Sequence, residues 1–137
     1  MWNTRGVVRR VAGSVAIGVT AAACGHAPST APGTSQGPVK LNDVTSAQVV
    51  AAIAKAGLPA LNSHDVTAQE CPSARCSEAT ATDTVTVLKF PTTGSAQQYA
   101  ATVSNAFQIE DLVLVFAPSV TAELKRDYEK VVQRAAV

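Results

Sequence analysis

Two cysteines, Cys71 and Cys76, form a close pair whose thiols could do covalent chemistry. In an exported chain such a pair is expected to form a disulfide, and closing so short a loop contributes only about 2 kcal/mol, which braces a local turn. Thioredoxin-like redox chemistry uses Cys-x-x-Cys at a helix start, whereas this spacing is Cys-Pro-Ser-Ala-Arg-Cys. A structural zinc site needs four ligands, and His64 is the only histidine after residue 38 that could join the thiolates. The sequence therefore predicts a disulfide and no metal site.

Histidine and carboxylate side chains are weaker candidates for chemistry. The adjacent pair His64-Asp65 does not by itself define a catalytic triad, which is recognised by geometry. Glu110-Asp111 could take a cation, but two exposed carboxylates beside a strand are more often solvated. Since no nucleophile, metal or acid–base motif is present, the sequence predicts no enzyme, no catalytic residue and no cofactor. The candidate groups considered for an enzyme are His64, Asp65, Glu70, Asp83, Glu110 and Asp111.

The N-terminal 23 residues have the pattern of a signal peptide. Arg5, Arg9 and Arg10 hold this end on the cytoplasmic side, and residues 11–23 are apolar or small throughout. As a helix, residues 11–23 rise only about 20 Å, well short of the roughly 30 Å hydrocarbon core, so they are a signal h-region and not a stable span. The segment ends in Ala21-Ala22-Ala23-Cys24-Gly25, where small residues precede a cysteine.

This ending resembles the lipobox of bacterial lipoproteins, although Ala21 stands where a leucine is commoner. The resemblance implies that the Cys24 thiol accepts a diacylglyceryl group as a thioether and becomes the mature N-terminus. Two or three acyl chains, palmitate among them, then anchor the protein stably at the extracytoplasmic face of the cell membrane. The alternatives are a secretory signal that happens to contain a cysteine at its cleavage site, and, for Arg9-Arg10, export by the twin-arginine route in place of the general one.

Composition limits the remaining function classes. Of 11 Lys+Arg, three arginines leave with the signal, so eight remain against ten Asp+Glu and the mature charge is about −2. A net charge of this sign is no footprint of nucleic-acid binding, which needs a clustered basic surface. Abundant Ala, Val and Thr with scarce Lys resembles the small envelope lipoproteins of mycobacteria and other actinobacteria, a resemblance that carries no activity motif.

The mature chain divides into a linker and one domain. Residues 24–38 comprise the lipidated cysteine and a Pro/Gly/Ser/Thr-rich stretch that predicts a flexible tether. Residues 39–137 are long enough for one globular core. The first expected helix, residues 46–56, begins after a Thr45…Gln48 capping box, the second is expected to be capped by Thr93, and the last by Thr121.

Alternating and continuous apolar patterns predict the strands. Residues 66–70 suggest a short edge strand. Residues 77–90 suggest either a hairpin turning near Thr82-Asp83 or one long bent strand, with either a bulge or burial on both faces near Leu88. Residues 112–116 predict a central strand. We therefore expect an α+β fold, a small two-layer sandwich of three or four mainly antiparallel strands covered on one face by about three helices.

Three functions from different classes fit these observations. The first is a noncatalytic interaction module, anchored through Cys24, that engages a membrane sensor, a transporter or another envelope component. The second is a small-molecule or lipid carrier, which would need an apolar cavity of about 300 Å³ or more. The third is an enzyme, which lacks a motif. The sequence favours the interaction module and leaves the partner, the strand order, the oligomeric state and the envelope layer undetermined.

Overall fold

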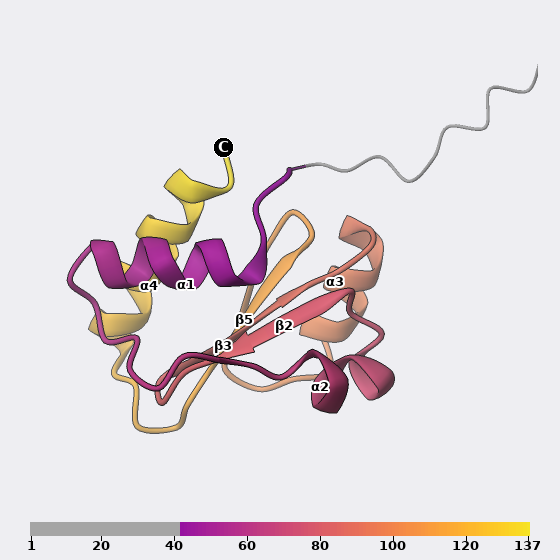
Figure 1. The fold of residues 1–137 in the computed structure, drawn as a ribbon, viewed down its shortest axis with the longest axis horizontal. Coiled ribbons are helices and arrows are strands. Elements are labelled where there is room, and N and C mark those ends of the chain that lie inside the picture. Colours follow the sequence, from indigo (N-terminus) through magenta and orange to yellow (C-terminus); the bar gives the residue numbers. More distant parts are fainter. Residues whose placement is uncertain (1–41) are drawn as a thin grey trace, which may run out of the picture. The chain divides into compact units, whose positions relative to one another are not determined.

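Four helices pack on a five-stranded antiparallel sheet in residues 42–137, the part of the chain that the computed structural model describes (Figure 1). The strands lie in the order β1-β2-β3-β5-β4. The predicted α+β class and antiparallel pairing are confirmed, although the sheet has one strand more than the three or four expected. The elements are α1 (Ser46–Lys55), β1 (His64–Asp65), α2 (Thr67–Ala74), β2 (Glu78–Ala81), β3 (Val85–Lys89), α3 (Thr93–Ala100), β4 (Ala106–Ile109), β5 (Leu112–Phe116) and α4 (Ala122–Ala135).

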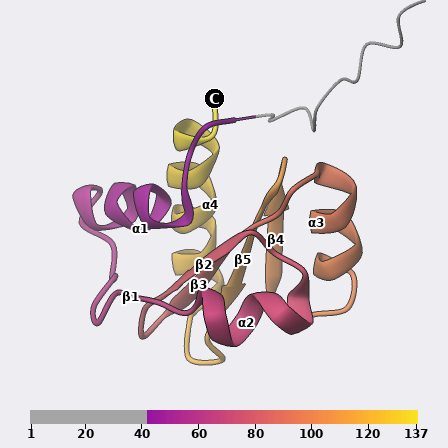
Figure 2. The ribbon, with the colours of Figure 1, turned by 45° about the vertical axis from the view of Figure 1, so that its right-hand side comes forward.

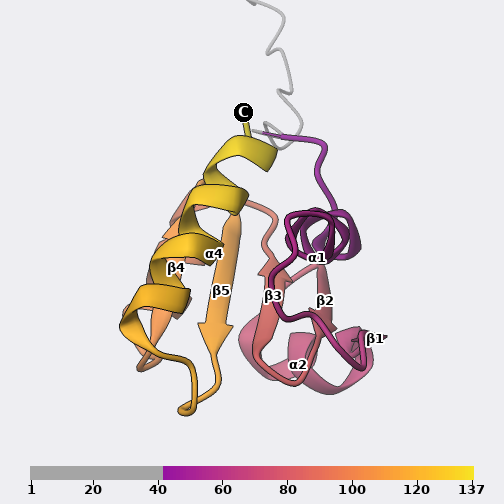
Figure 3. The same cartoon turned by 90° about the vertical axis from the view of Figure 1, so that its left-hand side faces the viewer.

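Helices cover both faces of the sheet, so the expected two-layer sandwich was wrong. One face packs against α1 and α4, and the opposite face packs against α2 and α3 (Figures 2 and 3). The physical reason is that the central strands are apolar on both sides. Val87 and Leu114 point to the α1/α4 face, whereas Leu88 and Val113 point to the α2/α3 face, and all four are almost fully buried. A second apolar face needs its own cover.

Side-chain caps set the starts of three helices. The predicted capping box of α1 is present, since Thr45 accepts from the Gln48 amide and the Gln48 side chain accepts from the Thr45 amide. Thr121 caps α4 as predicted. The cap of α3 is Thr92, one residue before the predicted Thr93, because Thr92 is still extended and its hydroxyl accepts from the Ser95 amide.

The strand pattern was predicted correctly in two places. The chain turns at residues 82–84, so β2 and β3 form the expected hairpin and not one bent strand. Strand β5 lies inside the sheet between β3 and β4 and is buried on both sides, as the continuous apolar run from Leu112 to Phe116 indicated. Strand β4, which pairs with β5 at the edge, was not predicted, because its sequence Ala-Phe-Gln-Ile does not alternate strictly between apolar and polar residues.

Residues 66–70, expected as a strand, are the N-cap residue and the first turn of helix α2. The edge strand β1 comes just before them and contains only His64 and Asp65. The Asp65 carboxylate accepts from the Thr67 amide at 2.8 Å, which favours a turn into a helix at this point. Within residues 42–137, none of the helices combines the length and apolarity needed to span a membrane. The predicted signal, the lipidation of Cys24 and the tether at 24–38 lie outside these residues.

Candidate functional site

Helices α1 and α4 cross on one face of the sheet (Figure 2). Side chains from their C-terminal halves line an open groove between them. The hollow measures about 590 Å³, and a smaller one of about 200 Å³ adjoins it toward the loop after α1. We call the two hollows together the α1/α4 groove. Its lining residues are Ala52, Lys55, Ala56, Leu58, Asp127, Lys130, Val131, Arg134 and Ala135.

The groove combines an apolar floor with a basic rim. Val131 is only 8% exposed and belongs to the core beneath, while Leu58 packs at the edge of that core. Lys55 comes from the last turn of α1 and Arg134 from the last turn of α4, where cations also interact favourably with the carbonyl ends of the helices. Among the ion pairs within residues 42–137, none includes Lys55 or Arg134, whereas Lys130 pairs with Asp127 at 3.1 Å.

A buried ion pair fixes the start of the domain to the sheet. The Lys89 ammonium lies 3.1 Å from the Asp111 carboxylate, and the two side chains are 12% and 5% exposed. Lys89 also donates to the side-chain oxygen of Asn42 and to the Val44 carbonyl, both at 2.8 Å. The ammonium is thus surrounded by oxygens, as a buried charge requires. We call Asn42, Val44, Lys89, Glu110 and Asp111 the linker junction.

The β4–β5 turn supplies the acidic half of the linker junction. The side-chain amide of Asn42 donates to the Glu110 carboxylate at 2.6 Å and to the Asp111 carboxylate at 2.8 Å. Glu110 has φ +50°, a left-handed conformation that is uncommon for residues other than glycine. The bonds to Asn42 help to hold this turn, so the predicted acidic pair is a structural partner of the incoming chain.

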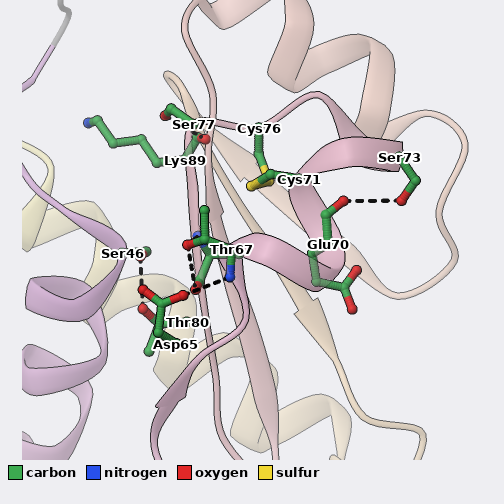
Figure 4. Close-up of a disulfide and its surroundings, with 11 residues drawn as sticks. Ser46, Asp65, Thr67, Glu70, Cys71, Ser73, Cys76, Ser77, Thr80 and Lys89 are labelled. Atoms are coloured by element: carbon green, nitrogen blue, oxygen red, sulfur yellow. Dashed lines mark hydrogen bonds between the residues drawn. A yellow bond between two sulfur atoms is a disulfide. The ribbon is translucent and has the colours of Figure 1, made fainter.

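A disulfide joins Cys71 in α2 to Cys76 just before β2 (Figure 4). The predicted disulfide is therefore present. Between the two cysteines, Arg75 ends α2 in the left-handed conformation with φ +61°. At the other end of α2, the Thr67 hydroxyl accepts from the Ala79 amide at 2.9 Å. The helix is thus fastened to β2 by polar contacts of Val66 and Thr67 with Ala79 at its start, and to the residues that lead into β2 by one covalent bond near its end.

The candidate acid–base residues lie in separate places. His64 is exposed, with its Nδ1 2.7 Å from the Asn62 carbonyl, and the Asn62 amide donates to Asp83 at 2.7 Å. Asp65 serves the turn into α2, and Glu110 and Asp111 belong to the linker junction. Across residues 42–137, no three His, Cys, Asp or Glu side chains are grouped so that they could hold a metal ion.

Glu70, the remaining candidate, lies near Tyr99 at the α2/α3 side of the sheet. The Tyr99 ring is 5.2 Å from the ring of Phe90 and half-buried. Burial, and to a lesser degree the negative charge of Glu70, raise the pKa of the Tyr99 phenol above its ordinary value. Because Glu70 lies on α2, part of this pKa shift depends on the position of that helix.

Sequence reasoning missed Lys89 and Asn42. One signal was available for Lys89, because it continues the inward alternation of Val85 and Val87 and so points a charge toward the α1/α4 face. Asn42 gave no such signal, since its partners are tens of residues away in the chain. Searches with this chain against protein-family models, curated proteins and solved structures gave no match.

Proposed function

We propose that this chain is an extracytoplasmic lipoprotein, anchored to the cell membrane through Cys24, whose domain is a noncatalytic interaction module. The observation that carries the proposal is the α1/α4 groove, an apolar floor bordered by Lys55 and Arg134 on the surface of a domain whose mature charge is about −2. Local positive charge on an otherwise acidic molecule favours a partner of complementary charge.

The partner class follows from the lining of the groove. An acidic segment that also presents an apolar side chain would place its carboxylates at Lys55 and Arg134 and its apolar group over Val131. Such a segment fits an extracytoplasmic loop of a membrane sensor or transporter, or another envelope protein. The groove is formed by helices that pack on the larger core, so it offers a largely pre-formed surface.

The linker junction supports the same proposal. A tethered module must keep its fold while its partner and its anchor pull on it from different sides. Lys89 and Asp111 bind the first residues of the domain at Asn42 and Val44, so a load from the linker reaches the sheet directly. The fold is therefore braced where a membrane tether would join it.

Crosslinking in cells tests the proposal. We expect the full chain to capture one membrane or envelope protein, and Cys24→Ala to abolish the capture because the domain is no longer held at the membrane. Lys55→Glu with Arg134→Glu should abolish capture while leaving membrane partition unchanged. Arg126→Glu is the matched control, since it reverses an exposed charge on α4 outside the groove and should have no effect.

Two results would contradict the proposal. If Cys24→Ala still partitions into the membrane, Cys24 does not carry the anchor. If capture survives both groove substitutions, the α1/α4 groove is not the binding surface. Each part is thus tested separately.

A small-molecule or lipid carrier is the second candidate. The α1/α4 groove is open to solvent, whereas a carrier needs a concave apolar pocket of about 300 Å³ or more that buries most of its ligand. Native mass spectrometry of the purified full chain would support the carrier if a bound small molecule were lost in the Lys55→Glu/Arg134→Glu variant. A chain that retains no ligand under these conditions would speak against it.

A further inference from the structure

Helix α2 has little stability of its own. It has only eight residues, and isolated helices shorter than about 12 residues are marginal in water. Its N-cap, Val66, makes no side-chain capping bond, and none of its residues is fully buried. Pro72, inside the helix, lacks the amide that would continue the hydrogen-bond ladder. Residues outside the helix must therefore keep it folded.

The two ends of α2 are held in different ways. At its start, the Thr67 hydroxyl accepts from the Ala79 amide, and the Val66 amide donates to the Ala79 carbonyl at 3.0 Å. Near its end, the Ser73 hydroxyl donates to the Glu70 carbonyl and the Arg75 amide donates to the Cys71 carbonyl. Among the described contacts, these side-chain and cap bonds therefore stay within the helix. Besides the packing of Cys71 and Ala74 on the core beneath, the disulfide ties this end to the chain leading into β2 (Figure 4).

We propose that the Cys71–Cys76 disulfide is a redox latch, and that its reduction releases the C-terminal part of α2 from the sheet while the α1/α4 side stays folded. A dithiol donor supplies the two electrons and two protons. One donor thiolate attacks a cysteine sulfur, the protein S–S bond breaks, and the second donor thiol closes the donor's own disulfide. Cys71 and Cys76 each end the reaction as a free thiol.

The consequence is confined to one face because the two cores are separate. Cys71, Ala74 and Cys76 pack against the cluster that contains Ala79 and Leu88, whereas α1 and α4 pack on the opposite cluster. Release of α2 uncovers part of the cluster that contains Ala79 and Leu88. Reduction would thus expose the part of this apolar face that α2 covers, while α3 stays in place and the domain stays folded.

Hydrogen exchange of the purified full chain tests the latch, with the oxidised chain compared with the chain reduced by dithiothreitol. We expect the amides of residues 69–71 and 73–75 to exchange about 30-fold faster after reduction, the equivalent of about 2 kcal/mol of loop-closure entropy. Amides of α1 and of β5 serve as internal controls and should exchange at unchanged rates. Alkylation of both thiols confirms that reduction was complete.

Two outcomes would overturn the proposal. Unchanged exchange in α2 would show that packing alone holds the helix, and an equal acceleration in α1 and β5 would show that reduction unfolds the whole domain. The variant Pro72→Ala gives a second, independent arm, because it restores a helix amide without touching the cysteines. In the reduced Pro72→Ala chain we expect α2 to exchange at least about tenfold more slowly than in the reduced parent, and no slowing would contradict the latch.

Discussion

The two faces of the sheet are covered by helices of different quality. On the α1/α4 face, amphipathic helices with side-chain caps bury large residues such as Ile53 and Tyr128 completely. On the α2/α3 face the fully buried cluster is smaller, and one of the two covering helices has no cap and no fully buried residue. A disulfide lies on this second face alone. Apolar packing holds the helices on the α1/α4 face, whereas a covalent bond adds to the weaker packing of α2 on the opposite face.

The groove and the latch lie on opposite sides of this division. The proposed binding groove is built on the well-packed face, where a rigid surface lowers the entropic cost of binding. The proposed redox latch lies on the weaker face, where local opening is cheapest. The difference predicts distinct responses to substitution.

The largest effect is expected at the linker junction on the α1/α4 face. Lys89→Met leaves the Asp111 carboxylate buried without its cation and should lower the free energy of unfolding by about 3–5 kcal/mol, measured by chemical denaturation. Adding Asp111→Leu should restore much of this loss, because both charges are then gone. A single variant as stable as the parent would mean that the pair is not buried in solution.

A matched pair of substitutions compares the two cores directly. Leu114→Ala and Leu88→Ala remove the same atoms from fully buried positions on opposite faces, and each should lower the free energy of unfolding by about 2–5 kcal/mol. We expect the smaller loss for Leu88→Ala, because α2 can move inward and partly fill the space. A larger loss for Leu88→Ala in denaturation experiments would contradict the difference between the faces.

The smallest effect concerns the pKa of Tyr99. Burial is the main cause of its raised pKa and Glu70 the second, so Glu70→Gln should lower the Tyr99 pKa only in part. Because the folded-state pKa is raised, the stability linked to it is fully present below about pH 10 and is lost as pH rises through the folded value. Phenolate absorbance follows the titration, and Tyr99→Phe identifies its signal. An unchanged titration in Glu70→Gln would mean that α2 does not hold Glu70 near Tyr99.

Local bonding explains which elements were predictable. The Thr45…Gln48 capping box and the Thr121 cap were visible because all their partners lie within three residues. The central strand was visible because five consecutive apolar residues are unambiguous. Helix α2 was not, because it is held by Cys71–Cys76 and by contacts with Ala79 rather than by an apolar pattern of its own.

The candidate sites show the same division. Cys71 and Cys76 could be paired from their types and spacing alone, since a covalent bond between near neighbours needs little knowledge of the fold. The α1/α4 groove could not, because Lys55 and Arg134 come from the two ends of the domain and meet only where the helices cross.

The sequence by itself determined the α+β class, the caps of α1 and α4 and the disulfide, since each depends on residues close in the chain or on a simple apolar period, and it left residues 77–90 as either a hairpin or one bent strand. Only the tertiary structure decided that helices cover both faces and that Lys89 meets Asn42, 47 residues away. The physical reason is that burial of a second apolar face and pairing of a buried charge are set by contacts between distant segments, which no local pattern records.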